Sequence, residues 1–377
     1  MTINFNKPFL TNKEESYFRD MIGNNKFYGD GKYNDLCRKR IIKEIKSENV
    51  LMTDSCTSAL DIAAMIISQK VKKKTILCPS YTFSSTASAF LKAGFNIKFI
   101  DINKSNLMID IKTLDQIDLS DVAGVVGVHY AGNTFNISVI QRFCKKNKLY
   151  FIEDAAQGYG CFYKNKALGT FGDFGTFSFH ETKNIHCGLG GALICKEEDD
   201  LSLATYIAER GSNRSDLLKG LVDKYTWVSV GGSYTLSEIS ASFLYPQLMG
   251  FKSNFLYRKK LWNQYYINLN KSKNKLFRTI QLNKDVSSNY HAFYLIFKTN
   301  NLCDEYRSKL LEQDIHAYIG YVPLHSSPFA KSSKKCFSSD LTNTSELAER
   351  ILRLPLHNNL TKIDINKVTK LLLENEK

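Results

Sequence analysis

The chain has 377 residues, of which 43% are hydrophobic and 23% are charged. These values are typical of a globular protein of one or two domains and exclude a disordered, collagen-like or coiled-coil chain. The net charge of +14 favours anionic partners, but the basic residues form short clusters without a nucleic-acid-binding motif. We therefore expect phosphorylated small molecules as partners, and no nucleic acid.

The sequence also favours a cytoplasmic protein without a membrane partner. No stretch approaches the ~20 apolar residues of a membrane-spanning helix, and the first residues lack a basic start followed by an apolar core. The nine cysteines are scattered singly, without a CxxC pair, and no histidine pair has metal-ligand spacing. We expect reduced thiols and no metal site.

Alternating strand and helix patterns occupy residues 50–195 and are typical of an α/β domain with a mostly parallel sheet. Helical patterns such as 84–93 and 137–146 separate predicted strands at residues 75–78, 97–100, 122–128, 149–153, 175–179 and 192–195. Several of these strands end in small or polar residues. Because ligands bind at the carboxyl ends of strands in open α/β sheets, a site is expected there.

A long helix is predicted from about residue 237 to 266, with a break near Pro246 and Gly250. After it, the regular alternation of strand and helix patterns ceases. This change predicts a smaller α+β domain at the C-terminal end.

The predicted domains are therefore a large α/β domain over residues 1–250 and a small α+β domain over residues 251–377. We expect the first segment, residues 1–30, to pack on the small domain.

Two residues at predicted strand ends suggest catalysis. Lys183 follows an apolar strand and precedes the glycine-rich residues 188–191; burial of its amine would lower the pKa and favour the nucleophilic form. Asp154 follows the apolar residues 149–152, where a carboxylate needs a cationic or hydrogen-bonding partner. The protonated pyridine nitrogen of pyridoxal phosphate (PLP) is one such partner. The alternatives are a solvated loop lysine and a capping aspartate.

A phosphate site is predicted at residues 53–59, a run of small and polar residues before an amphipathic helix. Backbone N–H groups at a helix N-terminus bind anions, and Ser178 could add a hydroxyl. A simple Ser/Thr helix cap is the alternative. Phe83 could stack on a cofactor ring or belong to the core.

Several blocks in a fixed order carry a resemblance to a known family: Gly29-Asp30-Gly31, residues 79–83, 128–132, 153–157 and 167–170, and Pro323-Leu324-His325. With them, the chain resembles the DegT/DnrJ/StrS family of sugar aminotransferases. The resemblance implies PLP as cofactor and PLP-dependent fold type I, the fold of aspartate aminotransferase. It also implies a homodimer with shared active sites.

Residues 179–184, 211–215 and 222–227 resemble one branch of that family more specifically. The branch moves an amino group from L-glutamate to C4 of dTDP-4-dehydro-6-deoxy-D-glucose. The product is dTDP-4-amino-4,6-dideoxy-D-galactose, which serves cell-surface polysaccharides such as enterobacterial common antigen and the O-antigen of lipopolysaccharide.

The resemblance assigns a role to each matching residue. Lys183 would hold PLP covalently, and Asp154 would pair with the ring nitrogen. Gln157 would contact the ring hydroxyl, and Phe83 would stack on the ring face. The phosphate would be bound by Cys56, Thr57 and Ser178.

Three further residues have predicted roles outside this set. The segment 225–234 would reach the partner subunit's cofactor, and within it Ser233 stands where many family members have a phosphate-binding Asn. Tyr321 and His325 would line the sugar pocket; a core tyrosine and a capping histidine are the alternatives.

Four other functions compete with this one. Related PLP-dependent sugar dehydratases carry a histidine in place of the lysine, so Lys183 argues against that activity. The remaining alternatives are an aminotransferase that acts at C3 or gives the gluco epimer, a non-catalytic regulatory or binding protein, and a basic nucleic-acid binder.

Overall fold

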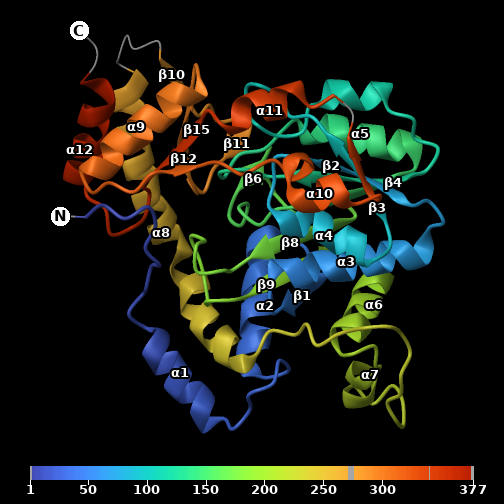
Figure 1. Cartoon of the computed structure of the whole chain (residues 1–377). Helices are drawn as coiled ribbons and strands as arrows, with labels where there is room; N and C mark the ends of the chain where they lie inside the picture. The colour runs from blue at the N-terminus through green and yellow to red at the C-terminus, as the bar shows by residue number, and fades with distance from the viewer. Residues whose placement is uncertain (1, 271–275, 339, 375–377) are drawn as a thin grey trace.

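A mostly parallel sheet of eight strands forms the centre of the computed structural model, which describes residues 2–270, 276–338 and 340–374 (Figure 1). Only β9 is antiparallel to its neighbours, β1 and β8. In spatial order the strands are β1 (Val50–Thr53), β9 (Gly191–Cys195), β8 (Phe174–Ser178), β5 (Tyr150–Asp154), β4 (Val122–Val128), β2 (Thr75–Pro79), β3 (Asn96–Ile100) and β14 (Cys336–Ser338).

Helices cover both faces of this sheet, so its central strands are almost wholly apolar. One face packs on α3 (Cys56–Lys70), α4 (Ser84–Lys92) and α6 (Glu198–Ala208), and the other on α2 (Lys32–Ile45), α5 (Ile137–Asn147) and the first half of α8 (Glu238–Asn270). Neighbouring residues alternate between the two cores: Leu193 packs with α3, and Ile194 packs with α2. The predicted α/β architecture is confirmed.

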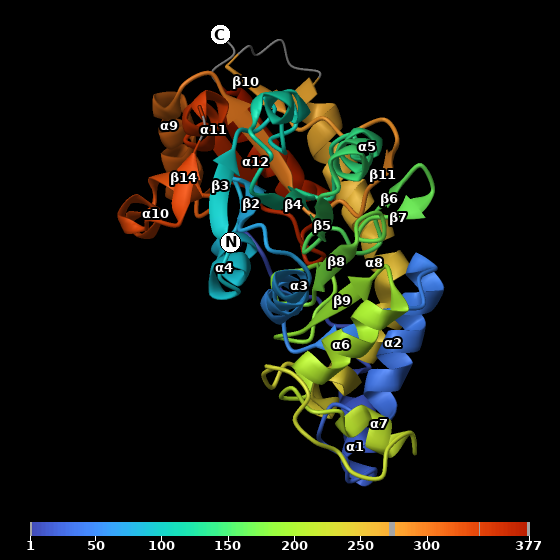
Figure 2. The same cartoon turned by 90° about the vertical axis from the view of Figure 1, so that its right-hand side faces the viewer.

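A second, antiparallel sheet lies beside the first (Figure 2). It joins β10 (Phe277–Thr279), β12 (Phe293–Phe297), β15 (Ile351–Leu354) and β13 (Tyr318–Ile319). The helices α9 (Asn300–Glu312) and α12 (Lys362–Leu373) contribute Leu310 and Ile365 to its core. The smaller remaining elements are α1 (Glu14–Gly23), η1 (Ile111–Gln116), β6 (Phe162–Tyr163), β7 (Lys166–Ala167), α7 (Arg214–Leu218), β11 (Val286–Ser287), η2 (Leu324–Ser326), α10 (Pro328–Ser332) and α11 (Thr342–Ala348).

The predicted break near Pro246 and Gly250 is wrong, because α8 continues through both residues. Proline inside a helix removes one hydrogen bond and crowds the preceding turn. Leu244, Leu248 and Phe251 are buried on the same side of the helix, in the core that α8 shares with α2. Burial of this apolar stripe offsets the cost of the proline.

Several contacts cross the predicted domain boundary at residue 250, and the division itself stays a prediction. Helix α8 spans it, and β14 pairs in parallel with β3 of the large sheet. At the N-terminal end, Ile3 bridges to Ile315, and the Phe5 ring packs edge-on against Tyr318. Helix α1 instead packs against the first half of α8, where Tyr17 contacts Tyr245.

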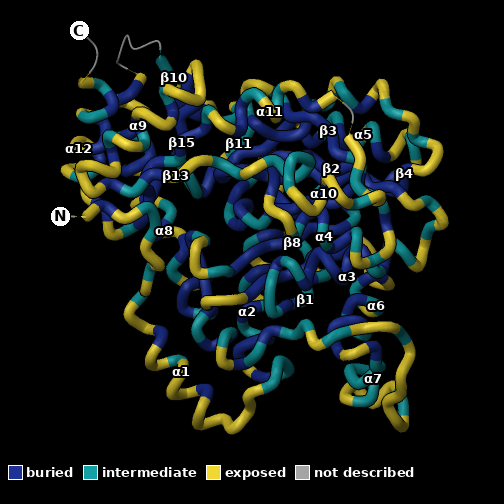
Figure 3. Tube along the Cα trace, viewed as in Figure 1, coloured by how far each residue is buried: buried dark blue, intermediate teal, exposed yellow. Residues whose placement is uncertain are grey.

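Buried residues gather in the two sheets, whereas α1 and the chain around α7 are largely exposed (Figure 3). Among the helices of the described residues, none combines the length and apolar character needed to cross a membrane.

Candidate active site

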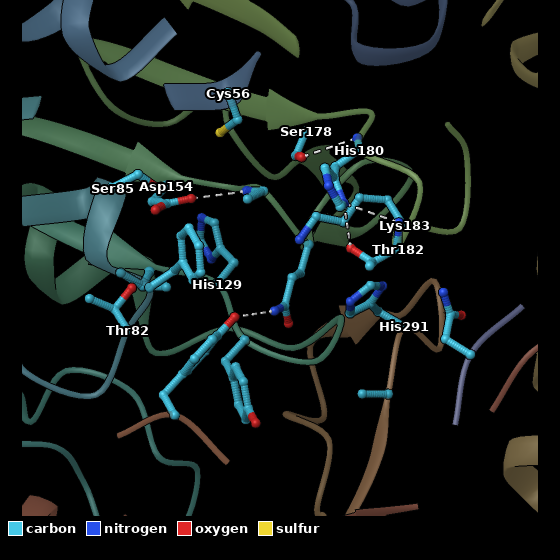
Figure 4. A pocket seen from close by; sticks show the side chains of 18 of the residues that line it. Cys56, Thr82, Ser85, His129, Asp154, Ser178, His180, Thr182, Lys183 and His291 are labelled. Atoms are coloured by element: carbon cyan, nitrogen blue, oxygen red, sulfur yellow. Dashed lines mark hydrogen bonds between the residues drawn. The ribbon is translucent and has the colours of Figure 1, made fainter. Parts of the chain in front are cut away.

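The residues predicted for the site meet at the carboxyl ends of the parallel strands. Asp154 ends β5, Ser178 ends β8, Lys183 follows β8, and Cys56 begins the helix after β1. They line a cavity of about 570 Å³, whose far wall comes from the small sheet (Figure 4). Thr57, Phe83, Gln157 and Tyr321 line the same cavity.

The first turn of α3 forms an anion site on one side of the cavity. Ser55 caps the helix, and its Oγ accepts a hydrogen bond from Ser58 N at 3.0 Å. The N–H groups of Cys56 and Thr57 lie in the first turn, where an N–H group has no intrahelical acceptor, so they are available to a ligand beside the positive end of the helix dipole. A Cβ at Gly191 would lie 2.4 Å from Cys56 N, so only glycine lets β9 approach this turn.

The Asp154 carboxylate is 5% exposed and is fixed by two hydrogen bonds. Its Oδ2 accepts from Thr86 Oγ1 at 2.7 Å, and its Oδ1 accepts from Ala156 N at 3.1 Å. Each carboxylate oxygen has two lone pairs, so capacity remains for a third donor from the cavity. The arrangement fits a protonated ring nitrogen.

Lys183 extends into the cavity between these two groups (Figure 4). Burial lowers the pKa of its amine, and the Arg353 charge acts in the same direction, whereas Cys56 and Asp154 oppose the shift. The neutral, nucleophilic amine is therefore more populated than in an exposed lysine.

Gln157 and Tyr321 form the side of the cavity next to Asp154. Gln157 Oε1 accepts from Ala131 N at 2.6 Å, and its Nε2 donates to the Tyr321 hydroxyl at 2.8 Å. The Phe83 ring is 59% exposed although it lines a cavity. A large apolar ring left open in this way is suited to stacking on a flat ligand.

His325 and Ser233 do not line this cavity in the described structure. His325 Nδ1 lies 2.7 Å from Ser80 Oγ, and its Nε2 lies 3.3 Å from Ser345 Oγ. Contacts of this kind are expected for a structural role, the alternative to a place in the sugar pocket. Ser233 is exposed and bridges to Glu209. Its predicted phosphate contact therefore requires a second subunit.

The cavity wall also contains residues without a role in the sequence-based prediction, among them His129, His291 and Arg353. His129 follows β4 within a recognised block, and its Nε2 donates to the buried Glu153 carboxylate at 2.8 Å. His291 Nδ1 lies 3.0 Å from Asn184 Oδ1. The strand-end pattern could have indicated His129, but Arg353 lies within β15, where the strand-end pattern does not apply.

Comparison with known proteins agrees with this geometry. The profile of the DegT/DnrJ/EryC1/StrS aminotransferase family matches residues 8–373. The chain belongs to this family. Like other members, it is a PLP-dependent nucleotide-sugar aminotransferase, and the predicted fold type I, cofactor and enzyme class are confirmed.

Its similarity to individual family members is distant but covers nearly the whole chain. The UDP-4-amino-4,6-dideoxy-N-acetyl-beta-L-altrosamine transaminase of Campylobacter jejuni is 27% identical, over 89% of this chain and 87% of that protein. The dTDP-4-dehydro-2,3,6-trideoxy-D-glucose 4-aminotransferase of Saccharopolyspora spinosa is 24% identical, over 86% of this chain and 83% of that protein. The PLP-form structure of the sugar aminotransferase Spr1654 from Streptococcus pneumoniae is 18% identical in sequence. It superimposes with a TM-score of 0.89, over 99% of this chain and 98% of that chain.

The residues present fit PLP, whose ring accepts the electron pair released at the substrate carbon. The turn at Cys56 and Thr57 matches a phosphate, and the oriented Asp154 carboxylate matches the protonated ring nitrogen. Lys183 lies between them with an amine that can bind an aldehyde carbon and then carry a proton.

Proposed function

We propose that this aminotransferase moves an amino group from L-glutamate to C4 of dTDP-4-dehydro-6-deoxy-D-glucose. The product would be dTDP-4-amino-4,6-dideoxy-D-galactose, for enterobacterial common antigen or the O-antigen of lipopolysaccharide. The observation that supports the sugar most directly is the run 179–184, because it resembles this branch of the family and contributes His180, Thr182 and Lys183 to the cavity. The names of both relatives, a 4-amino-4,6-dideoxy sugar transaminase and a 4-aminotransferase, also refer to an amino group at C4.

In this proposal, the predicted site residues have the following roles. Lys183 holds PLP, removes the proton from Cα of the donor and later delivers a proton to C4 of the sugar. Asp154 keeps the proton on the ring nitrogen. The phosphate is held by Cys56, Thr57 and Ser178, the ring hydroxyl faces Gln157, and the ring face lies on Phe83.

The sugar side of the cavity comes from Tyr321, with His325 behind it. Burial raises the pKa of the Tyr321 hydroxyl, so that group stays protonated. It can therefore donate a hydrogen bond to a sugar hydroxyl or accept one from it. His325 bonds to Ser80, and its contribution to the sugar is indirect.

We propose a homodimer in which the segment 225–234 completes the partner's site. Tyr225, Trp227 and Val230 in this segment are 58%, 77% and 66% exposed. Exposed apolar side chains on one segment mark an interaction surface, and Ser233 lies among them. Light scattering at several protein concentrations tests the dimer, and loss of PLP affinity in Ser233→Ala tests the shared site.

The decisive experiment is incubation with L-glutamate and dTDP-4-dehydro-6-deoxy-D-glucose, followed by NMR of the product. We expect an amino group on C4 in the axial orientation. An amino group on C3, or an equatorial C4 amine, would instead establish the related aminotransferase with another regiochemistry or the gluco product. UDP- and GDP-linked sugars in parallel reactions test the nucleotide.

The cofactor step is tested separately from the sugar. Visible absorption of the purified enzyme should show a yellow band that L-glutamate bleaches, and Lys183→Ala should not bleach in this way. A protein without the band after incubation with PLP would contradict the assigned roles of Lys183 and Asp154.

A further inference from the structure

His291 is a histidine in the wall of the active-site cavity that has no role in the assignments above. Its ring projects into the space that Lys183 also enters (Figure 4). Both side chains line a smaller recess beside the cavity as well, together with Asn184. What the ring can do for its neighbours depends on which of its two nitrogens carries a hydrogen.

Asn184 determines where the hydrogen of the neutral His291 ring lies. Asn184 Nδ2 donates to the Asn289 carbonyl at 2.9 Å, so the amide of Asn184 turns its oxygen toward the histidine. This oxygen, Oδ1, lies 3.0 Å from His291 Nδ1 and can only accept a hydrogen bond. Nδ1 therefore carries the hydrogen and donates it to Asn184.

The ring is neutral, and its second nitrogen is an acceptor. Burial lowers the pKa of His291 well below its ordinary value. The positive charges of Lys183, Arg258 and Arg353 act in the same direction. With the hydrogen on Nδ1, Nε2 has a lone pair and no hydrogen. Nε2 has no hydrogen-bond partner among the described residues, so the ring offers an acceptor to the cavity.

The backbone around His291 is held in place as well as the ring. Arg258, on α8, donates from Nη2 to the His291 carbonyl at 2.6 Å and from Nε to the Tyr290 carbonyl at 3.1 Å. Asn254, one turn earlier on α8, donates from Nδ2 to the Asn184 carbonyl at 2.7 Å. The acceptor nitrogen is thus held in a fixed position relative to the loop that carries the reacting lysine.

We propose that His291 is a positioning residue for Lys183: its Nε2 accepts a hydrogen bond from the Lys183 amine while that amine is free of the cofactor. In this state Lys183 takes up and returns protons, and an amine on a flexible four-carbon chain needs a partner that orients it. A neutral acceptor orients the amine without holding its proton as tightly as a carboxylate would. The inference rests on the aminotransferase chemistry proposed above, and not on which sugar is aminated.

Two substitutions separate the roles of the two ring nitrogens. The amide of asparagine reaches the place of Nδ1, so H291N keeps the bond to Asn184 and loses the acceptor in the cavity. The amide of glutamine reaches the place of Nε2, so H291Q keeps the acceptor and loses the bond to Asn184. H316N is the matched control, because His316 lies outside the described cavity lining.

Stopped-flow bleaching of the PLP-loaded enzyme by L-glutamate measures the effect on the free lysine. H291N should lower the rate constant at saturating L-glutamate about 10- to 100-fold, the range for loss of a hydrogen bond to a charged group. The L-glutamate concentration for half-maximal rate should change less than about threefold, since donor binding is not affected. H291Q and H316N should stay within about threefold of the wild type in both quantities.

The PLP-free protein gives a second readout. The rate at which added PLP generates the yellow band depends on the unprotonated Lys183 amine, so its pH profile reports the pKa of that amine. A neutral acceptor at hydrogen-bond distance favours the protonated form. H291N should therefore move the midpoint of the profile down by about one pH unit, and H291Q should not. The other groups that shift the pKa of Lys183, namely Cys56, Asp154 and Arg353, are the same in all variants.

H291N that matches the wild type in both readouts would overturn the proposal. A loss in H291Q as large as that in H291N would overturn it too, because the ring would then act through Asn184 and the packing of the loop. If H291N does not fold, H291Q decides: an unchanged rate and midpoint support the acceptor, and a loss of either contradicts it.

These measurements contain no sugar, so a different product in the NMR experiment would leave the result for His291 standing. A wild type that L-glutamate does not bleach would contradict the proposed function. The pH profile of PLP binding would then still test the contact between His291 and Lys183.

Discussion

Glu153→Gln should destabilise the fold strongly although the side chain keeps its size. The Glu153 carboxylate is wholly buried and accepts four hydrogen bonds. Its Oε1 accepts from Phe171 N at 2.5 Å and Gly172 N at 2.8 Å, and its Oε2 accepts from Gly169 N at 3.0 Å and His129 Nε2 at 2.8 Å. An amide has one oxygen, so two of these four donors would face an NH₂ group.

Each buried donor left without an acceptor costs about 1–3 kcal/mol. The expected loss in the free energy of unfolding is therefore about 2–6 kcal/mol, a large part of the stability of a typical domain. The same change releases His129, whose ring stacks on Phe135 at 5.3 Å and lines the cavity, so PLP affinity should fall as well.

The assay is urea unfolding followed by circular dichroism, on PLP-free and PLP-loaded protein. Glu48→Gln is the control, since Glu48 is exposed and its change should stay within about 0.5 kcal/mol. A Glu153→Gln protein that unfolds within about 1 kcal/mol of the wild type would refute the reasoning.

Three further predictions concern the cofactor groups. PLP-free wild type should gain stability relative to Lys183→Met as the pH rises from neutral toward the ordinary lysine pKa of 10.5, because the unfolded chain binds more protons than the folded one; urea unfolding across that range measures it. Gly191→Ala should weaken PLP binding at least about tenfold in a fluorescence titration, because the added Cβ would collide with the first turn of α3. Gly23→Ala is the control: its Cβ would meet nothing within 4 Å, so PLP binding should be unchanged. Thr86→Val removes the hydroxyl that donates to Asp154, so steady-state kinetics should show kcat about 10-fold lower or more.

The sequence predicts the large sheet well because its strands are buried on both faces. The predicted range 75–78 lies within β2, and 175–179 is shifted by one residue from β8. The pattern could not predict β14, because Cys336–Ser338 lies in a polar Ser/Lys stretch and is only partly buried. That strand depends on its pairing with β3, far away in the sequence.

The site residues also divide into those that a local sequence pattern predicts and those that depend on distant pairing. Lys183, Asp154 and Ser178 follow or end strands, so the local pattern together with the rule for parallel sheets predicts that they lie close together. The anion turn at Cys56 is equally local, since it needs only a helix start after β1. Arg353 could not be found by either route, because antiparallel pairing in the small sheet brings it to the cavity.

The two groups of residues also lie on different sides of one cavity. The large sheet supplies the groups that fit PLP, namely the anion turn, Asp154 and Lys183. The small sheet and the N-terminal segment supply Tyr321, Arg353 and Phe5, which face the opposite side of the same space. We propose that discrimination among keto sugars comes from neutral hydrogen-bonding groups on this side, such as the Tyr321 hydroxyl, and from the segment 225–234 of the proposed partner subunit.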